Sequence, residues 1–233
     1  MREEPAGGPV PWCMMQWLTR LRAAPIENLL LPGGRVPVVP LLVLLPSWIS
    51  AILLDRPPRG DESLFFFYVT DLADPFTLLP GLAVGPLLNT ALSQVLLVSG
   101  LVLFFGIPLE RRLGAGRTLA IFWTASIAGS IGGAAMIHAA QALAPDATIV
   151  ERAWDRAYGG GSAGGFGLMG AYAAGARSSM PWIALFAAWE VMAWYIVLQN
   201  LTPAFHVVAF AAGMVAGRVM LAGRLEARPT EPL

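Results

Sequence analysis

Two residues of this chain carry side chains that together could perform nucleophilic catalysis, a serine and a histidine. Ser162 lies in the stretch Tyr158–Gly170, in which seven glycines surround it. A serine hydroxyl becomes a nucleophile when a nearby imidazole accepts its proton. His206, one of only two histidines in the sequence, follows Pro203 at the start of an apolar run. The pair predicts covalent catalysis by Ser162 with His206 as its general base, provided that the fold brings the two side chains together.

The glycines around Ser162 indicate a helix whose backbone packs closely against a neighbour. Glycine costs roughly 1 kcal/mol relative to alanine inside a helix, so a helix with so many glycines must gain from close approach. In a bilayer, small residues four positions apart allow this approach, and both Gly160/Gly164 and Gly161/Gly165 have that spacing. An alternative interpretation is that Ser162 is merely a small residue in such a helix.

The composition predicts a protein that crosses a membrane several times. Of the 233 residues, 56% are hydrophobic and only 13% are charged, and the mean hydropathy is +0.63. Fifteen arginines balance fifteen acidic residues, which leaves no electrostatic case for binding nucleic acid. Cys13 is the only cysteine, so an internal disulfide and a thiolate metal cluster are excluded. With two isolated histidines and no HExxH motif, we expect neither a metal site nor a cofactor.

Six apolar runs predict an all-α membrane protein that spans the bilayer six times. The predicted spans are 36–54, 84–107, 118–142, 160–176, 182–199 and 203–222. They form one membrane domain, 36–222, between an N-terminal cytoplasmic or interfacial segment, 1–35, and a cytoplasmic tail, 223–233. After span one, the aromatic cluster Leu64–Tyr68 suits a membrane interface, and after span two Glu110–Arg117 is predicted to form a charged turn.

The arginines predict that both termini lie in the cytoplasm. With six spans, eleven arginines fall on the side of the termini and four on the opposite side, and positive residues are enriched in cytoplasmic loops. Ser162 and His206 then lie near the outer ends of spans four and six, within roughly 10 Å of the outer surface. His206 shares a helix face with Phe210, Gly213 and Gly217, so we expect it to face a closely packed helix.

The other polar residues of the spans leave several interpretations open. His138, near the outer end of span three, could be the base in place of His206, or it could serve packing alone. Glu190 falls near the middle of span five, where an ionised carboxylate is costly, so we expect it to be protonated or paired and to have a structural role. No acid is placed by the sequence to orient His206, and we therefore predict a dyad rather than a triad. His206 could also be a packing residue that bonds a backbone carbonyl.

Three pieces of the sequence, in the same order and topology, resemble the rhomboid family of intramembrane serine proteases over about residues 36–222. The matching residues are Glu110-Arg-Arg-Leu-Gly-Ala-Gly after span two, then Gly160, Ser162, Phe166, Leu168 and Gly170 on span four, and His206, Ala209, Gly213 and Gly217 on span six. The resemblance implies that Ser162 is the nucleophile and His206 the general base. It also implies that Phe166 packs against the imidazole.

The chain departs from the rhomboid pattern at positions that help to bind the oxyanion. Members of the family typically carry a histidine and an asparagine four residues apart on span two, and the corresponding residues here are Gln94 and Val98. Gln94 still offers an amide donor, whereas Val98 offers none. The backbone N–H of Ser162 at the helix entrance, supported by Gly161, remains available. The family's Trp-Arg pair in the first loop is also missing, so the pattern permits a slow protease or an inactive one.

The sequence thus predicts an intramembrane serine endopeptidase that cleaves transmembrane segments of membrane-protein substrates, which enter laterally between spans two and five. Its expected surroundings are the lipid bilayer of a bacterial inner membrane, and its oligomeric state is left open. One alternative is a weak or inactive rhomboid-like protein that binds transmembrane helices for quality control or trafficking. Another is a small transporter that uses Glu190 and His138, although the sequence contains no visible inverted repeat.

Overall fold

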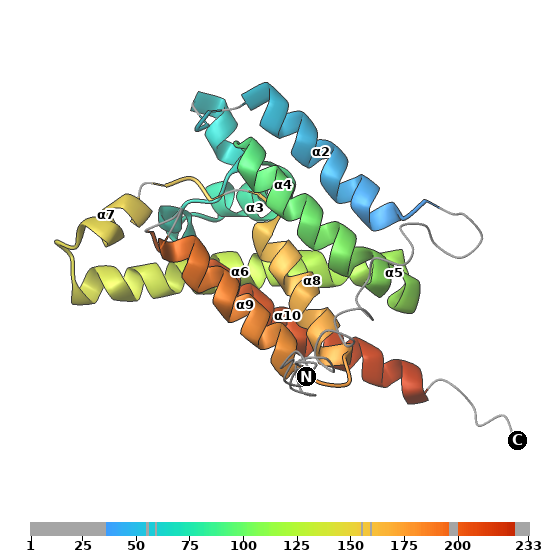
Figure 1. The fold of residues 1–233 in the computed structure, drawn as a ribbon. Helices are drawn as coiled ribbons and strands as arrows, with labels where there is room; N and C mark the ends of the chain where they lie inside the picture. Colours follow the sequence, from blue (N-terminus) through green and yellow to red (C-terminus); the bar gives the residue numbers. More distant parts are fainter. Residues whose placement is uncertain are drawn as a thin grey trace, which may run out of the picture.

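The structure of the chain is a computed structural model that describes residues 36–54, 56–58, 60–154, 156–158, 160–195 and 200–226. The predictions for segment 1–35 and for residues 227–233 of the tail lie outside these residues. In the described part, all regular structure is helical, which agrees with the all-α class (Figure 1). The β contact found there is an isolated bridge between Phe67 and Tyr158.

The α-helices are joined by turns and short 3₁₀ segments. In chain order they are α2 (Val38–Leu54), α3 (Pro75–Val84), α4 (Leu92–Leu101), α5 (Ile107–Leu113), α6 (Ala115–Leu143), α7 (Thr148–Trp154), α8 (Ser162–Gly175), α9 (Met180–Ala193) and α10 (Thr202–Glu226). The 3₁₀ segments are η2 (Gly60–Phe65), η3 (Val69–Ala73) and η4 (Gly85–Leu87). A π-helical turn, η5 (Val102–Gly106), joins α4 and α5 into one continuous helix.

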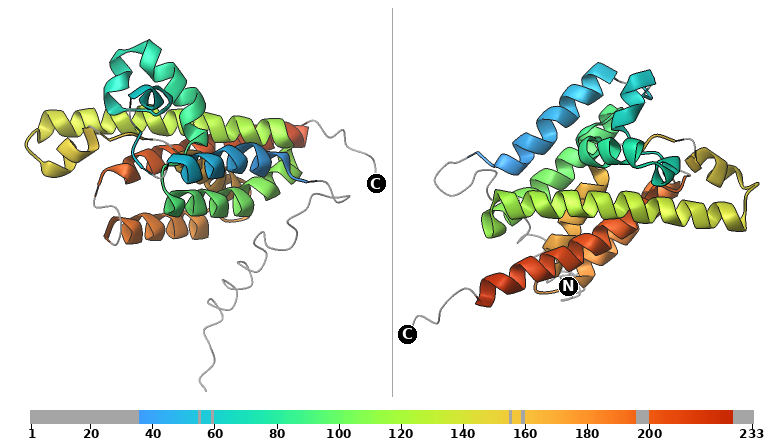
Figure 2. Two further views of the ribbon diagram at one scale, coloured as in Figure 1. Left: turned by 90° about the horizontal axis from the view of Figure 1, so that it is seen from above. Right: turned by 180° about the vertical axis from the view of Figure 1, so that it is seen from behind.

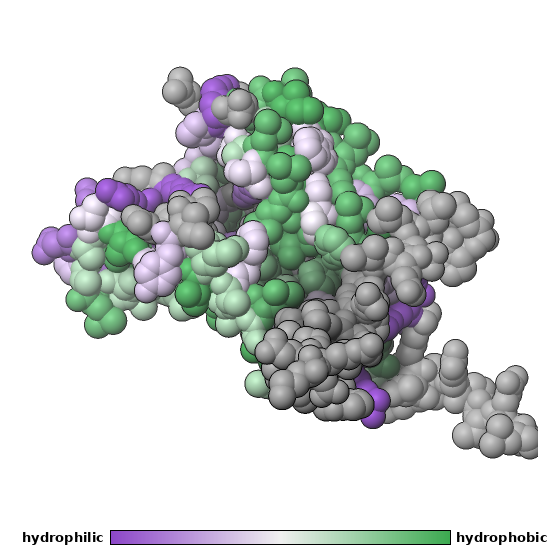
Figure 3. Space-filling view, viewed as in Figure 1, coloured by the Kyte–Doolittle hydropathy of each residue, from purple (hydrophilic) through white to green (hydrophobic). Residues whose placement is uncertain are grey.

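Three helices of the described part are long and apolar enough to cross a bilayer. They are Leu92–Leu113, which comprises α4, η5 and α5, Ala115–Leu143, which is α6, and Thr202–Ala222 within α10. Helix α2 is apolar but has 17 residues, and α8 and α9 have 14 each. Apolar residues cover the visible faces of α2 and α4, whereas hydrophilic residues gather over α7 (Figure 3). Within the residues that the structure describes, three of the six predicted spans are thus long and apolar enough to cross a bilayer.

The second predicted span, 84–107, begins too early. Residues 75–84 form the separate helix α3, and the chain is extended at Ala91 before α4 begins at Leu92. Pro86, which has no N–H to donate, lies in the intervening 3₁₀ turn. Hydropathy reads this segment as one continuous apolar run, because it does not register where the backbone changes direction.

The charged turn predicted after span two is instead the last turn of a helix. Helix α5 runs through Glu110 to Leu113, and the chain reverses at Gly114, whose φ is +85°. The two carboxyl oxygens of Glu110 accept hydrogen bonds from the N–H groups of Val38 and Val39, at 2.8 and 2.9 Å. Glu110 thereby satisfies N–H groups at the start of α2 that have no partner within that helix.

The aromatic cluster predicted for the membrane interface is in part a protein core. Phe66 and Phe67 are 2% and 1% exposed, and the Phe67 ring meets that of Phe205 in α10 edge to face at 6.4 Å. Leu64 and Phe65 of the same cluster are exposed. Burying a phenylalanine stabilises a protein by roughly 1.5–3 kcal/mol, so the loop gains by folding back over α10 rather than facing lipid.

Helix α8 lies against both α6 and α10 (Figure 2). A Cβ added at Gly213 of α10 would overlap the carbonyl oxygen of Gly167 in α8, and one added at Gly170 of α8 would overlap the carbonyl oxygen of Phe210 in α10. The backbones of the two helices are therefore in direct contact from both sides. This confirms the predicted close packing of the glycine-bearing helices, and it sets the separation of their first turns.

Replacing Glu110 with glutamine removes the charge and one of the two acceptors at the start of α2. We expect the free energy of unfolding to fall by about 1–3 kcal/mol, because a backbone N–H loses its partner. Thermal unfolding in detergent, followed by circular dichroism, measures the change. A midpoint equal to that of the wild-type protein would contradict the contribution assigned to these bonds.

Candidate active site

Ser162 is the first residue of α8, and the glycines before it shape the entrance of this helix. Gly160 has a φ of +97°, which residues with a side chain rarely adopt. A Cβ at Gly160 would also overlap the Gln94 amide nitrogen and lie 2.5 Å from Asn89 Oδ1. Gly161 is the N-cap of α8. The N–H groups of the first turn have no partner within the helix, so they point outward from the α8 N-terminus.

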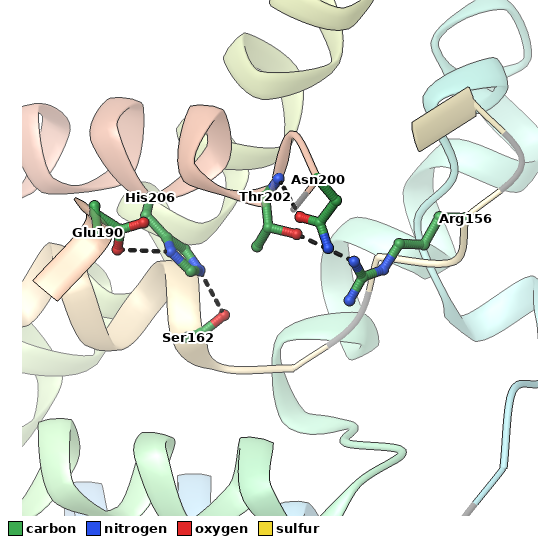
Figure 4. Close-up of polar contacts among 6 residues, drawn as sticks. All are labelled: Arg156, Ser162, Glu190, Asn200, Thr202 and His206. Carbon is green, nitrogen blue, oxygen red and sulfur yellow. Dashed lines mark hydrogen bonds and ion pairs between the residues drawn. The ribbon is translucent and has the colours of Figure 1, made fainter. Parts of the chain in front are cut away.

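The structure brings Ser162 and His206 together near the N-termini of α8 and α10. His206 Nε2 lies 3.1 Å from Ser162 Oγ, although the two residues are 44 positions apart (Figure 4). Both side chains are buried, with exposed fractions of 9% for Ser162 and 4% for His206. At this distance the hydroxyl can donate a hydrogen bond to the ring nitrogen, which is the arrangement that a general base requires.

The other nitrogen of the imidazole contacts Glu190, an acid that the sequence did not place beside His206. His206 Nδ1 lies 2.9 Å from Glu190 Oε1, so Ser162, His206 and Glu190 form one chain of hydrogen bonds (Figure 4). The sequence predicts a dyad and a Glu190 that is protonated or paired and has a structural role; the pairing is confirmed, and the partner is His206. It missed this partner because Glu190 and His206 lie on separate helices, α9 and α10, and no local pattern of residues specifies how two helices are rotated against each other. The available signal was the acid itself, since a carboxyl in an apolar helix needs a partner.

Aromatic rings restrict the orientation of the imidazole. Phe166, one turn after Ser162 in α8, packs against His206 with ring centroids 4.5 Å apart, which is the contact that the family resemblance implied. Phe166 also meets Phe186 of α9 edge to face at 5.3 Å, and Phe186 stacks on Phe210 of α10 at 4.4 Å. Each such ring contact contributes roughly 0.5–1.5 kcal/mol beyond burial. The three helices that carry the polar residues are thus also joined by rings.

A cavity of about 60 Å³ lies beside the serine and the histidine. Its lining includes Ser162 and His206, the side chain of Gln94 from α4, and Ser126 and Ser130 from α6. A water molecule needs about 10–15 Å³ of such space and two or more polar partners. The cavity therefore has room for a few water molecules next to Ser162, and Gln94, which the sequence analysis named as a candidate donor, is part of its lining.

Three further residues near Ser162 differ in what they could offer to an oxyanion. Gly161 is confined, because a Cβ there would lie 3.0 Å from both the Pro86 carbonyl oxygen and Val98 Cγ1. Val98 is fully buried and apolar, so it offers no donor. Asn89, which sequence reasoning missed, is fully buried beside Gly160, and neither Nδ2 nor Oδ1 has a hydrogen-bond partner in the described part of the chain. The sequence signal for Asn89 was a polar amide side chain inside the predicted apolar span 84–107.

Backbone hydrogen bonds hold the loop that leads into α8. Phe67 donates to the carbonyl of Tyr158 at 3.0 Å, and Tyr158 donates to that of Phe67 at 2.7 Å. The Tyr158 ring stacks on Phe205 at 4.1 Å, and burial raises the pKa of Tyr158 to about 12, so its hydroxyl stays a neutral donor. Nearby, Arg156 donates to Thr202 Oγ1 at 3.3 Å and so connects this loop to the start of α10 (Figure 4).

His138 takes no part in this site. Its Nε2 lies 3.2 Å from the Val69 carbonyl oxygen, and its ring packs against Trp154 at 4.7 Å. These contacts rule against the alternative in which His138 is the base for Ser162 and agree with a packing role. Among the residues that the structure describes, no three His, Cys, Asp or Glu side chains gather as they would around a metal ion.

Replacing Gly160 with alanine should disrupt the entrance of α8. A positive φ costs a residue with a side chain roughly 1–3 kcal/mol, and the new methyl group would also collide with the amides of Gln94 and Asn89. We expect lower thermal stability and weaker labelling of Ser162 by a fluorophosphonate. The control is Gly116→Ala on α6, where nothing lies within 4 Å of a new Cβ; equal behaviour of the two variants would contradict the assigned strain.

Comparison with known protein families identifies the family of this chain. The family model of the rhomboid domain matches residues 86–223, which is more than half of the chain and includes Ser162, Glu190 and His206. A search of curated proteins and a search of solved structures gave no significant match. From the extent of the domain match, we conclude that this protein belongs to the rhomboid family.

Proposed function

We propose that this rhomboid protein is an intramembrane serine protease that hydrolyses a peptide bond in or beside a transmembrane segment of another membrane protein. The observation that carries the proposal is the 3.1 Å contact between Ser162 Oγ and His206 Nε2 in a buried site. Membership of the rhomboid family supports the same reaction class, because the family includes intramembrane serine proteases. No cofactor is needed for this chemistry.

In the first half of the reaction, Ser162 Oγ attacks the carbonyl carbon of the scissile bond while His206 Nε2 takes the hydroxyl proton. The tetrahedral intermediate collapses when the imidazolium gives this proton to the leaving nitrogen and the C–N bond breaks. The new amino terminus departs, and the acyl group stays on Ser162. Water then attacks the acyl carbon with His206 again as the base, which releases the new carboxyl terminus and restores the serine.

The N-terminus of α8 supports stabilisation of the oxyanion. Because Ser162 begins the helix, its N–H lacks an intrahelical partner, and the helix dipole favours negative charge at this end. Gln94 lines the same cavity, which supports its proposed role as a side-chain donor. Val98 adds no donor, and loss of one donor costs on the order of 10²–10³ in rate in soluble serine proteases. The expected consequence is a slower protease than one with two side-chain donors.

An apolar groove supports lateral entry of the substrate. The groove has a volume of about 350 Å³ and lies between α9 and the helix formed by α4 and η5. Leu97 and Phe104 line it from one side, and Trp182 and Trp189 of α9 line it from the other. Phe166, which contacts His206, belongs to the same lining. A transmembrane helix of a substrate suits these walls, since its own surface is apolar.

The proposed membrane arrangement follows from the same helices and from the arginine distribution. Helices α2, α8 and α9 complete the six spans with the three long ones, in a membrane domain of residues 36–222 with both termini in the cytoplasm. The active site then opens toward the outer side, from which water reaches the cavity beside Ser162. The proposed location is a bacterial inner membrane.

Ser162→Ala should abolish cleavage of a reconstituted single-span substrate, and it should also abolish labelling of the protein by a fluorophosphonate. His206→Ala should lower both rates by at least about 10³-fold, because the hydroxyl loses its base. Proteoliposome cleavage assays and labelling rates measure these effects. The matched control is Ser179→Ala, which removes a hydroxyl at the N-cap of α9. This hydroxyl donates a hydrogen bond to the Ala173 carbonyl near the C-terminal end of α8.

Equal cleavage by the wild-type protein and Ser162→Ala would remove the proposal. A wild-type protein that binds transmembrane helices but neither cleaves nor labels would instead support the inactive, helix-binding alternative, which the missing donor at Val98 favours.

A further inference from the structure

We propose that Glu190 is a positioning residue for His206, so that the reaction uses a Ser162–His206–Glu190 triad in place of a dyad. This inference rests on the proposed protease function. It assigns Glu190 no contact with the substrate. Glu190 acts through the imidazole alone, by holding its tautomer and by stabilising its charged form.

The two hydrogen bonds of the imidazole determine where its proton lies. Glu190 Oε1 is 2.9 Å from Nδ1, and Ser162 Oγ is 3.1 Å from Nε2. A neutral imidazole has one N–H, and a carboxylate beside Nδ1 can only accept, so the proton stays on Nδ1. The Nε2 lone pair then points at the serine hydroxyl, ready to take its proton. When it does so, the positive charge of the ring forms next to the negative charge of Glu190.

The surroundings of Glu190 argue that a purely structural role would be expensive. Glu190 is 7% exposed, and its neighbours on α9 include the apolar Phe186 and Trp189. The second carboxyl oxygen, Oε2, is buried and has no hydrogen-bond partner within the described residues. A buried carboxylate with one unpaired oxygen lowers the stability of the protein. An apolar side chain of similar size would pack at least as well in this position. The carboxyl of Glu190 instead serves the imidazole of His206, whose tautomer it fixes and whose positive charge it stabilises.

The attachment of α9 to α10 does not depend on Glu190 alone. One turn away on each helix, Phe186 and Phe210 stack with their rings 4.4 Å apart and nearly parallel, at 11°. Phe166 of α8 contacts both Phe186 and His206. A substitution that preserves the shape of Glu190 therefore leaves the ring contacts between the helices in place, and the variant is expected to fold.

The test is Glu190→Gln, measured as kcat and KM for a single-span substrate in proteoliposomes. The amide has the size of the carboxyl but no charge, and its NH₂ can donate to Nδ1 and so favour the wrong tautomer. We expect kcat to fall on the order of 10²–10⁴-fold while KM changes by less than about twofold, because Glu190 does not touch the substrate. Glu190→Asp keeps the charge one methylene further away, so its kcat should recover to a value between those of Glu190→Gln and the wild type.

A double-mutant cycle separates positioning from structural support. If Glu190 acts through the imidazole, adding Glu190→Gln to His206→Ala leaves the residual fluorophosphonate labelling rate unchanged. A structural role lowers this rate by the same factor in both backgrounds, and that result would overturn the proposal. The matched control is Glu110→Gln, which alters another buried glutamate. Glu110 bonds the start of α2 and lies outside the candidate site. We expect this substitution to lower the unfolding midpoint and to leave kcat per folded molecule unchanged.

The outcomes for the two proposals are distinct. Wild-type kcat in Glu190→Gln, with Ser162→Ala and His206→Ala inactive, overturns the triad and leaves the protease with a dyad. Absence of both cleavage and labelling by the wild-type protein overturns the protease and the triad together.

Discussion

The direct contact between the backbones of α8 and α10 is the constraint on which the rest of the site depends. Glycines on both helices allow a separation that any side chain would prevent, as the overlaps at Gly170 and Gly213 demonstrate. Because the two helices cross at these glycines, their N-terminal turns are held close enough for an imidazole to reach a hydroxyl. At the usual distance of 8–10 Å between helix axes, the packing of the two helices would not by itself hold the imidazole within hydrogen-bond distance of the hydroxyl. The many glycines are unfavourable for an isolated helix, but here they place the first turns of α8 and α10 close together.

Helix α9 is attached to α10 in a different way. Its contacts to α10 run through side chains, the Glu190–His206 hydrogen bond and the Phe186–Phe210 stack. The same helix forms one wall of the apolar groove proposed for substrate entry. Helix α9 therefore carries both the partner of the imidazole and one wall of the groove.

Much of this protein could be predicted from the sequence. Hydropathy identified a helical membrane protein and located the long helices of the third and sixth predicted spans, because a run of apolar residues in lipid has to satisfy its backbone hydrogen bonds internally. Glycine spacing predicted the close packing, and the positions of Ser162 and His206 near helix starts predicted that they meet. Phe166 lies where the family resemblance implied, against the imidazole. The start of span two was wrong, and the burial of Phe66 and Phe67 was not foreseen, since hydropathy registers neither the turn at Pro86 nor the burial of a loop by other segments.

By itself, then, the sequence determined the helical class, the nucleophile and base candidates and the glycine faces, all of which follow from residue types within one segment. Only the tertiary structure decided that Glu190 meets His206, that His138 is a packing residue and that Asn89 lies beside Gly160. Each of these contacts joins side chains from separate segments. Their meeting depends on where each helix ends and how it is rotated against its neighbours, which no local pattern of residues specifies.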